Sequence, residues 1–387
     1  MKKNNIFFLT LVSLFLMFGM FTIIRTEKDI SYKENRYLQK FPHLTISNFL
    51  NGGYQGYLES ALTDQFVGGE TIKDMMHKVF NQFTIPKSGI FCENKYFHFG
   101  DYYTYNCDEV FIAGYTELDS ELEKELDLRI KMYSELNDYI DTYYYFISSS
   151  AVFNFEKNEY SFPFLDKLKE MSGKYHLSAF TFDNYEDYKK YFYNTDHHWN
   201  YLASYKGYID IMKMFDSSIK VLEPIDEVTF DFSFLGSSSR ILDFKEFNDK
   251  FTVYKFNIPF HVDYINKEEI GYGKQEKYFN REYVTETYTN HYGEFYGWDH
   301  GELVFDFNNK KLDNLLILSN SFSNPINELI ASHFNKTFVI DLRHYEKTFG
   351  EKFNIKEYIK ANKVDKVLVL GDYEYFSFPE FVFDMEG

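Results

Sequence analysis

The stretch LLILSNSFS at residues 315–323 indicates how this chain is built. Residues 315–318 form a short, continuous apolar run of the kind that makes a buried strand, and the run ends in a turn of Ser and Asn residues. A helical pattern follows over residues 325–334. In open α/β sheets, ligands bind in the crevice beyond the carboxyl ends of the strands. Ser321, just past this strand and just before the helix, is therefore a candidate nucleophile.

The same alternation of helical patterns and short apolar strands recurs along the chain. It predicts an α/β fold with a mostly parallel sheet and helices on both faces. Between about residues 225 and 308 the pattern changes to alternating strands, which predicts an inserted β-rich section that is mostly antiparallel or irregular. Outside it, strands are expected at 143–147, 180–182, 315–318, 337–341 and 366–371, with helices at 116–140, 165–171, 201–212, 325–334 and 355–361.

Length and charge limit the classes of function. A chain of 387 residues is long enough for one large domain or two ordinary ones, with a hydrophobic core that needs neither disulfides nor metal. Its formal net charge of −18 argues against sequence-independent nucleic-acid binding. The aromatic share of 21% has two explanations, the composition of the genome or an aromatic groove for carbohydrate.

The first residues predict a membrane anchor. Lys2 and Lys3 precede an uncharged run over residues 6–24, and Arg25 closes it. This length suits a membrane-spanning helix, and the two lysines favour a cytoplasmic N-terminus. We expect an uncleaved signal anchor at 1–26 and an extracytoplasmic domain at 27–387, on the exterior of the cell membrane. A cleaved signal peptide is the alternative.

The two cysteines, Cys92 and Cys107, flank a segment that reads as a hairpin around residues 100–101. In an oxidising exterior they could form a disulfide. The alternative is a pair of unpaired, buried thiols.

The densest chemistry lies in TDHHWN, residues 195–200, where an acid, two imidazoles and an indole follow one another. On an extended backbone, Asp196 and His198 would share one face and His197 would lie on the other. Asp196 could then orient His198 as the base that activates Ser321. Trp199 is expected to pack beside the imidazole. The alternative for Ser321 is a turn serine that caps the following helix.

A metal site is the other interpretation of Asp196, His197 and His198. Three consecutive side chains cannot converge on one ion from an extended backbone, and no other Cys or His cluster in the sequence completes a ligand set. We therefore expect neither a metal nor a cofactor.

The string TDHHW at residues 195–199 resembles the signature of the DHHW family. These are membrane-anchored bacterial proteins related to the alginate O-acetyltransferases of the SGNH-hydrolase superfamily. Further markers occur in the family's order: ENR with FP at 34–42, DQF at 64–66, and DLR at 341–343. The resemblance covers most of the chain after the expected anchor, and it implies an SGNH-like three-layer domain.

The resemblance also implies roles for individual residues. Asp196 corresponds to the orienting acid, His198 to the general base and Ser321 to the nucleophile. Asn320 and Gly236 are candidates for the oxyanion site or its turn. The implied reaction is transfer of an acyl group, usually acetyl, through an acyl-serine to or from a cell-envelope polysaccharide. A membrane-bound O-acyltransferase usually supplies the acyl group.

One departure from the family leaves a second function open. Where the family has Gly-Asp-Ser, this chain has Ser319, Asn320 and Ser321. The glycine would ease a tight turn, and the acid often braces it. A protein that has lost both could instead be a non-catalytic member that binds glycan or scaffolds an acyltransferase complex.

Overall fold

The computed structural model describes most of the chain after residue 118 and parts of the chain before it. Cys92 and Cys107 lie outside the described residues, as do residues 34–35 and most of the helix expected at 165–171. The described residues are 3–31, 36–42, 53–69, 71–72, 75–76, 96–99, 102–105, 108–113, 119–160, 166–167, 176–242, 245, 247, 249–270, 275–287 and 289–385.

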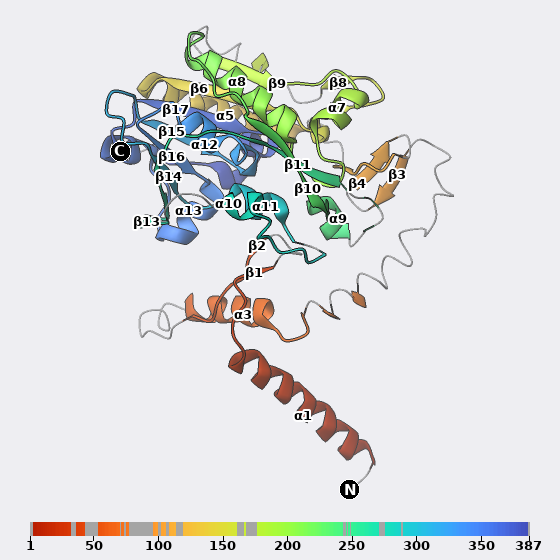
Figure 1. Ribbon diagram of the computed structural model, residues 1–387. Helices are drawn as coiled ribbons and strands as arrows, with labels where there is room; N and C mark the ends of the chain where they lie inside the picture. The colour runs from red at the N-terminus through yellow and green to blue at the C-terminus, as the bar shows by residue number, and fades with distance from the viewer. Residues whose placement is uncertain are drawn as a thin grey trace.

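An eight-stranded sheet forms the centre of the domain (Figure 1). Five neighbouring strands are parallel, and three more continue the sheet antiparallel beyond β16. Strand β15 lies between its parallel neighbours β16 and β17, so the turn after β15 leaves the sheet at an internal position of its carboxyl edge. In spatial order the strands are β13 (Glu268–Glu269), β12 (Val262–Ile265), β14 (Leu303–Asp306), β16 (Lys336–Ile340), β15 (Leu315–Ser319), β17 (Lys366–Gly371), β6 (Thr142–Ile147) and β9 (His176–Phe180).

Helices cover both faces of this sheet, as the alternation predicts. Residues 315 and 317 of β15 pack into one apolar cluster, and residues 316 and 318 pack into another on the opposite face. Such strands are buried on both faces, which explains why they read as continuous apolar runs. Helices α8 (Tyr201–Phe215) and α12 (Asn327–Ala331) join the first cluster, and α5 (Ser120–Tyr139), α13 (Leu342–Phe349) and α14 (Ile355–Asn362) join the second.

The section over residues 225–308 is β-rich, as predicted, but it does not stand apart from the main sheet. Strands β12, β13 and β14 extend that sheet, whereas β10 (Asp226–Phe234) and β11 (Asp249–Lys255) pair with each other. Aromatic side chains from β10, β11 and two short helices form a third apolar cluster. The short helices of this section are α9 (Ser237–Leu242), α10 (Glu276–Phe279) and α11 (His291–Tyr296).

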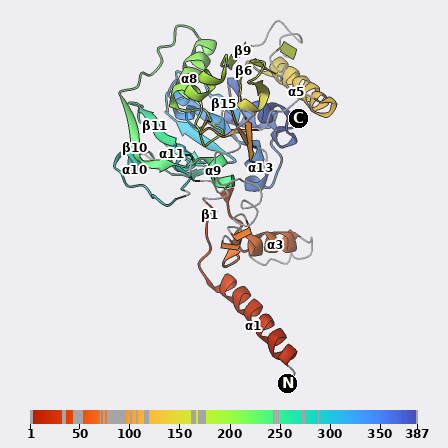
Figure 2. The ribbon, with the colours of Figure 1, turned by 90° about the vertical axis from the view of Figure 1, so that its right-hand side faces the viewer.

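The N-terminal part lies at one end of the domain in both ribbon views (Figures 1 and 2). Arg25, just after helix α1 (Lys3–Ile24), donates a hydrogen bond of 2.8 Å to the Gln65 carbonyl at the end of α3 (Gly53–Gln65). Within the described residues, no helix is found with the length and apolarity needed to cross a membrane. The hairpin expected around residues 100–101 is present, formed by β3 (Tyr96–Phe99) and β4 (Tyr102–Tyr105).

Several short elements complete the described chain. One of them, η3, carries Ser321. These elements are β1 (Ile30–Ser31), β2 (Arg36–Tyr37), β5 (Ile112–Ala113), η2 (Ser150–Val152), β7 (Phe153–Asn154), β8 (Glu159–Tyr160), α7 (Tyr185–Tyr191), η3 (Ser321–Ser323), α15 (Tyr373–Ser377) and η4 (Pro379–Phe381).

The burial of β15 can be tested by shortening one side chain. Leu316→Ala should lower the free energy of unfolding by about 2–5 kcal/mol, because Leu316 is fully buried and its loss leaves a cavity. Leu312→Ala is the matched control, since Leu312 is 39% exposed, and its effect should stay within about 0.5 kcal/mol. Urea unfolding followed by circular dichroism measures both, and equal losses would contradict the burial of β15.

Candidate active site

The TDHHWN segment forms the end of a closed loop. Phe192 and Trp199 form an antiparallel bridge, and the Asn200 N–H donates to the Tyr191 carbonyl at 2.8 Å. Between them the backbone bends, so the extended conformation expected for this segment is wrong. Tertiary contacts cause the bend, because the Thr195 carbonyl and hydroxyl accept hydrogen bonds from backbone N–H groups near the start of α9.

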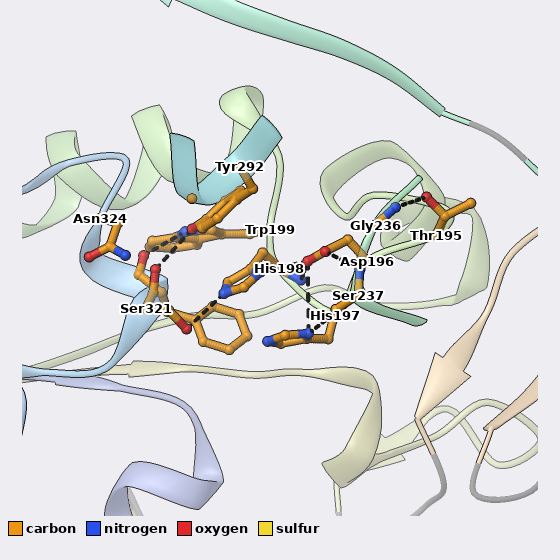
Figure 3. Close-up of polar contacts among 12 residues, drawn as sticks. Thr195, Asp196, His197, His198, Trp199, Gly236, Ser237, Tyr292, Ser321 and Asn324 are labelled. Carbon is orange, nitrogen blue, oxygen red and sulfur yellow. Dashed lines mark hydrogen bonds and ion pairs between the residues drawn. The ribbon is translucent and has the colours of Figure 1, made fainter. Parts of the chain in front are cut away.

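Asp196, His198 and Ser321 lie in one hydrogen-bonded line (Figure 3). The Nδ1 atom of His198 is 2.5 Å from Oδ1 of Asp196, and its Nε2 atom is 2.8 Å from the Ser321 Oγ. Asp196 and His198 are buried, whereas Ser321 is half-buried. This is the arrangement in which an imidazole, oriented by a carboxylate, can accept the proton of a serine hydroxyl.

Asp196 is held in its charged form. Oδ1 accepts the His198 backbone N–H at 3.0 Å, and Oδ2 accepts the Ser237 backbone N–H at 2.6 Å. Burial acts to raise the pKa of Asp196, but the charge of His198 and its hydrogen bond hold that pKa well below the ordinary value. An ionised Asp196 favours the His198 tautomer that carries its proton on Nδ1 and leaves Nε2 free to act as a base.

Gly236 lies behind Asp196, at the far end of the line from Ser321 (Figure 3). A Cβ atom on Gly236 would stand 2.3 Å from the Cβ of Asp196 and 2.5 Å from the Thr195 carbonyl oxygen. Its N–H donates to the Thr195 hydroxyl at 3.0 Å. The position requires glycine because the two backbones approach so closely. This location gives no support to the expected place of Gly236 beside the oxyanion.

The turn that carries Ser321 accommodates Ser319 and Asn320, the two residues that differ from the Gly-Asp-Ser motif. Ser319 is the last residue of β15 and has no positive φ, so the backbone does not require glycine there. Its hydroxyl lies 2.6 Å from that of Ser323. The Asn320 Oδ1 accepts the Phe322 N–H at 3.3 Å, and Nδ2 donates to Oδ1 of Asp372 at 3.1 Å. Asn320 therefore braces the turn.

Asp372 places a carboxyl group beside the side-chain amide of Asn320. It follows β17 directly and is buried. Burial, together with the nearby Glu374, raises its pKa. A raised pKa favours the neutral carboxyl, which suits a partner that is an amide.

Two aromatic residues join the loop of His198 to the turn of Ser321. Trp199 is fully buried and donates from Nε1 to the Phe322 carbonyl at 2.9 Å. Tyr292, on α11, stacks on the His198 ring at 4.0 Å between centroids and donates its hydroxyl to the Ser321 carbonyl at 2.9 Å. Trp199 thus packs against Phe322, whose ring also contacts the His198 imidazole, and its hydrogen bond fixes the turn.

An ion-pair network supports the other side of this turn. Arg343, in the DLR marker, binds Asp341 and reaches Asp299 at 3.0 Å. Asp299 also accepts a hydrogen bond of 2.8 Å from Asn324, three residues after Ser321. Burial acts to raise the pKa of Asp299, but the charge of Arg343 outweighs burial. The pKa of Asp299 is therefore below its ordinary value. The network is charged and holds Asn324 in place.

His197 lies beside His198 and not on an opposite face, contrary to the prediction for an extended backbone. The two imidazole centroids are 3.9 Å apart. Its Nδ1 atom is 2.7 Å from the Ser237 Oγ and 3.8 Å from Oδ1 of Asp196. Unlike its neighbours, the His197 side chain is 40% exposed.

The bent loop removes the geometric reason given against a metal ion. Ligand atoms of Asp196, His197 and His198 lie within 4.8 Å of one another. However, Nδ1 of His198 already forms a 2.5 Å hydrogen bond with Asp196, which an ion would have to displace. The described residues hold a second such group, Asp299, Asp341 and His344, but Arg343 already neutralises its carboxylates. Neither group could bind an ion without breaking these hydrogen bonds and ion pairs.

Sequence reasoning missed Ser237, Tyr292 and Asp372. Asp372 had a signal, because it directly follows the strand expected at 366–371 and so obeys the rule that identified Ser321. Ser237 and Tyr292 had none, since they reach the site only through the packing of α9 and α11.

Comparison with known proteins supports the fold. No family model matches the sequence, and no curated protein is significantly similar to it. Bacillus cereus PatB1, in a structure with a sulfonyl adduct, is 19% identical, with 75% of this chain and 98% of that chain covered and a TM-score of 0.55. A DHHW family protein from Eubacterium siraeum is 15% identical, with 73% and 94% covered and a TM-score of 0.53. At the level of fold, the predicted relation to the DHHW family is confirmed.

The pairing of Asn320 with Asp372 predicts a compensating double substitution. Asn320→Asp should lower the free energy of unfolding by about 1–3 kcal/mol, because two carboxyl groups would then meet in a buried place. Adding Asp372→Asn restores one amide and one carboxyl, so the double variant should recover most of the loss. Urea unfolding of the three variants measures this coupling, and additive losses would count against it.

Asp249 predicts a pH dependence of stability. Its Oδ2 accepts the Thr195 N–H at 2.9 Å, and burial raises its pKa to about 7. An unfolded Asp has a pKa of about 4, so between about pH 4 and 7 the folded state binds more protons and stability falls as pH rises.

Asp249→Asn removes this titration but keeps an oxygen that accepts the Thr195 N–H. Relative to the variant, wild type should lose on the order of 2–4 kcal/mol from pH 4 to 7 and then level off. Chemical unfolding at a series of pH values measures the difference. Parallel curves would show that Asp249 does not titrate in this window.

Proposed function

We propose that this protein is a serine acyltransferase or esterase that works through an acyl-enzyme on Ser321. The observation that supports the proposal is the line from Asp196 through His198 to Ser321, with spacings of 2.5 and 2.8 Å. Side chains from loops 123 residues apart meet at hydrogen-bond distance, and a turn serine that only caps a helix needs no such partner.

In the first half of the reaction, Ser321 Oγ attacks the acyl carbonyl carbon while Nε2 of His198 takes the hydroxyl proton. Asp196 stabilises the resulting imidazolium. The backbone N–H of Ser321 donates to no other residue in the described part of the chain and is a donor for the developing oxyanion. His198 then returns the proton to the leaving group. In the second half, an acceptor hydroxyl releases the acyl group by the same steps in reverse.

The proposed substrate is an exported or cell-envelope polysaccharide, O-acetylated with acyl groups from a membrane-bound O-acyltransferase. In this proposal residues 1–26 anchor the chain in the cell membrane and the domain faces the exterior. The support is in the sequence: the uncharged run at 6–24 between Lys3 and Arg25, and the TDHHW resemblance.

A non-catalytic role in glycan binding or scaffolding was the second function left open by Ser319 and Asn320. Both side chains form hydrogen bonds, Ser319 with Ser323 and Asn320 with Asp372, and neither displaces Ser321 from His198. Ser319 and Asn320 are therefore no argument for the non-catalytic role. The labelling experiment below distinguishes the catalytic role from the non-catalytic one.

Covalent labelling of the full chain tests the proposal. Wild type should react at Ser321 with a fluorophosphonate, read by peptide mass spectrometry, because His198 activates the hydroxyl. Ser321→Ala should take up no label at that peptide, and His198→Ala should react at least about 100-fold more slowly. A sulfonyl fluoride is a second reagent, chosen because PatB1 carries a sulfonyl adduct.

Asn324→Ala is a useful comparison, since it alters the same turn but leaves His198 and Ser321 in place. It should remain labelled. A folded wild-type protein that takes no label at Ser321 would overturn the acyl-serine proposal and leave glycan binding as the function to measure.

A further inference from the structure

We propose that His197 binds an O–H group of the acyl acceptor beside the acylated Ser321, either the second O–H of a water molecule or, on a sugar, the hydroxyl next to the one that reacts. This inference rests on the proposed acyl-serine function and adds a residue to its second half. It is supported by the fixed orientation and the exposure of an imidazole that takes no part in acylation, and the tautomer of that imidazole follows from the charge of Asp196.

The orientation of His197 is fixed from one side. Nδ1 meets the Ser237 Oγ at 2.7 Å, and the Ser237 backbone is itself held by Asp196. With Nδ1 turned inward, the Nε2 edge of the ring faces away from Asp196 and toward the side on which Ser321 lies (Figure 3). Nε2 has no partner among the described residues.

His197 is also the accessible member of the group. Its side chain is 40% exposed, whereas those of Asp196 and His198 are 1% and 4% exposed. Its centroid lies 3.9 Å from that of His198 and 5.8 Å from that of Phe322. A molecule approaching Ser321 from solvent therefore meets the His197 ring next to the base.

The charge of Asp196 decides which hydrogen bond His197 can offer. The ionised carboxylate, 3.8 Å from Nδ1, favours the tautomer with the proton on Nδ1, where it donates to Ser237. Nε2 then carries a lone pair. It can accept a hydrogen bond from an O–H group, but it cannot donate one to an oxyanion. The ligand class is therefore a hydroxyl compound and not the acyl carbonyl.

The step in which His197 takes part balances without any further reactant. The acceptor O–H bond breaks, a new bond forms from that oxygen to the acyl carbon, and the ester bond to Ser321 Oγ breaks. His198 carries the proton from the acceptor to Ser321 Oγ. His197 contributes position alone: its Nε2 accepts the O–H that does not react, the second one of water or a neighbouring hydroxyl of a sugar, and this holds the reacting oxygen near the acyl carbon.

Two substitutions separate this role from a structural one. The carboxamide of His197→Asn reaches as far as Nδ1 and can keep the Ser237 contact, but it leaves the place of Nε2 empty. The carboxamide of His197→Gln reaches as far as Nε2 and gives up the Ser237 contact.

The experiment uses the full chain with 4-nitrophenyl acetate as acyl donor. The initial burst of nitrophenolate measures acylation, and the steady rate measures release to water or to added glycerol. His197→Asn should keep the burst rate within about twofold and slow release about tenfold, the effect of one lost hydrogen bond. His197→Gln should retain more of the release rate than His197→Asn.

Each of the other outcomes contradicts either the proposed function or the proposed role of His197. A wild-type chain with no burst and no acetyl group on Ser321 would overturn the proposed function and, with it, this inference. A normal burst in both variants with unchanged release would overturn the role of His197 alone. Loss of the burst in His197→Gln with full activity in His197→Asn would show that His197 acts through Ser237.

Discussion

The negative charge buried on Asp196 is the constraint on which the rest of the site depends. An ionised carboxylate inside a protein is costly unless hydrogen bonds replace the water it has lost. Here the replacements are the ring and backbone N–H of His198 and the backbone N–H of Ser237. The bend of the loop, the start of α9 and the glycine at 236 all follow from bringing those donors to one side chain. The same charge sets the tautomers of both imidazoles.

A second constraint is that the acid and base must meet a serine from a distant part of the chain. The parallel sheet meets half of this requirement, because β15 is paired with β16 on one side and β17 on the other and places the turn of Ser321 at the carboxyl edge of the sheet. Trp199 and Tyr292 hold the loop of His198 against the turn of Ser321, because they donate hydrogen bonds to the carbonyls of Phe322 and Ser321, respectively. These two bonds explain how a loop without regular secondary structure can hold an imidazole at 2.8 Å from a hydroxyl.

The sequence predicted what depends on local pattern. Continuous apolar runs marked β6, β15, β16 and β17, since strands buried on both faces need such runs. The rule that ligands bind beyond the carboxyl ends of parallel strands led to Ser321, and applied once more it would have led to Asp372. The bend at residues 193–199 could not be read locally, because Thr195 and Asp196 are held by residues near 236. Nor could the joining of β12–β14 to the main sheet, which a pairing partner decides.

The separation of His198 and Ser321 by 123 residues ties reactivity to the completion of folding. Acid and base lie in a loop that closes early along the chain, whereas the serine arrives with β15, after the whole 225–308 section. A partly folded chain holds an ordinary hydroxyl and a solvated imidazole, and neither attacks an ester at a useful rate. Under the proposed function, Ser321 is therefore unreactive until the sheet has formed around β15. Acylation of Ser321 would report, molecule by molecule, that folding has finished.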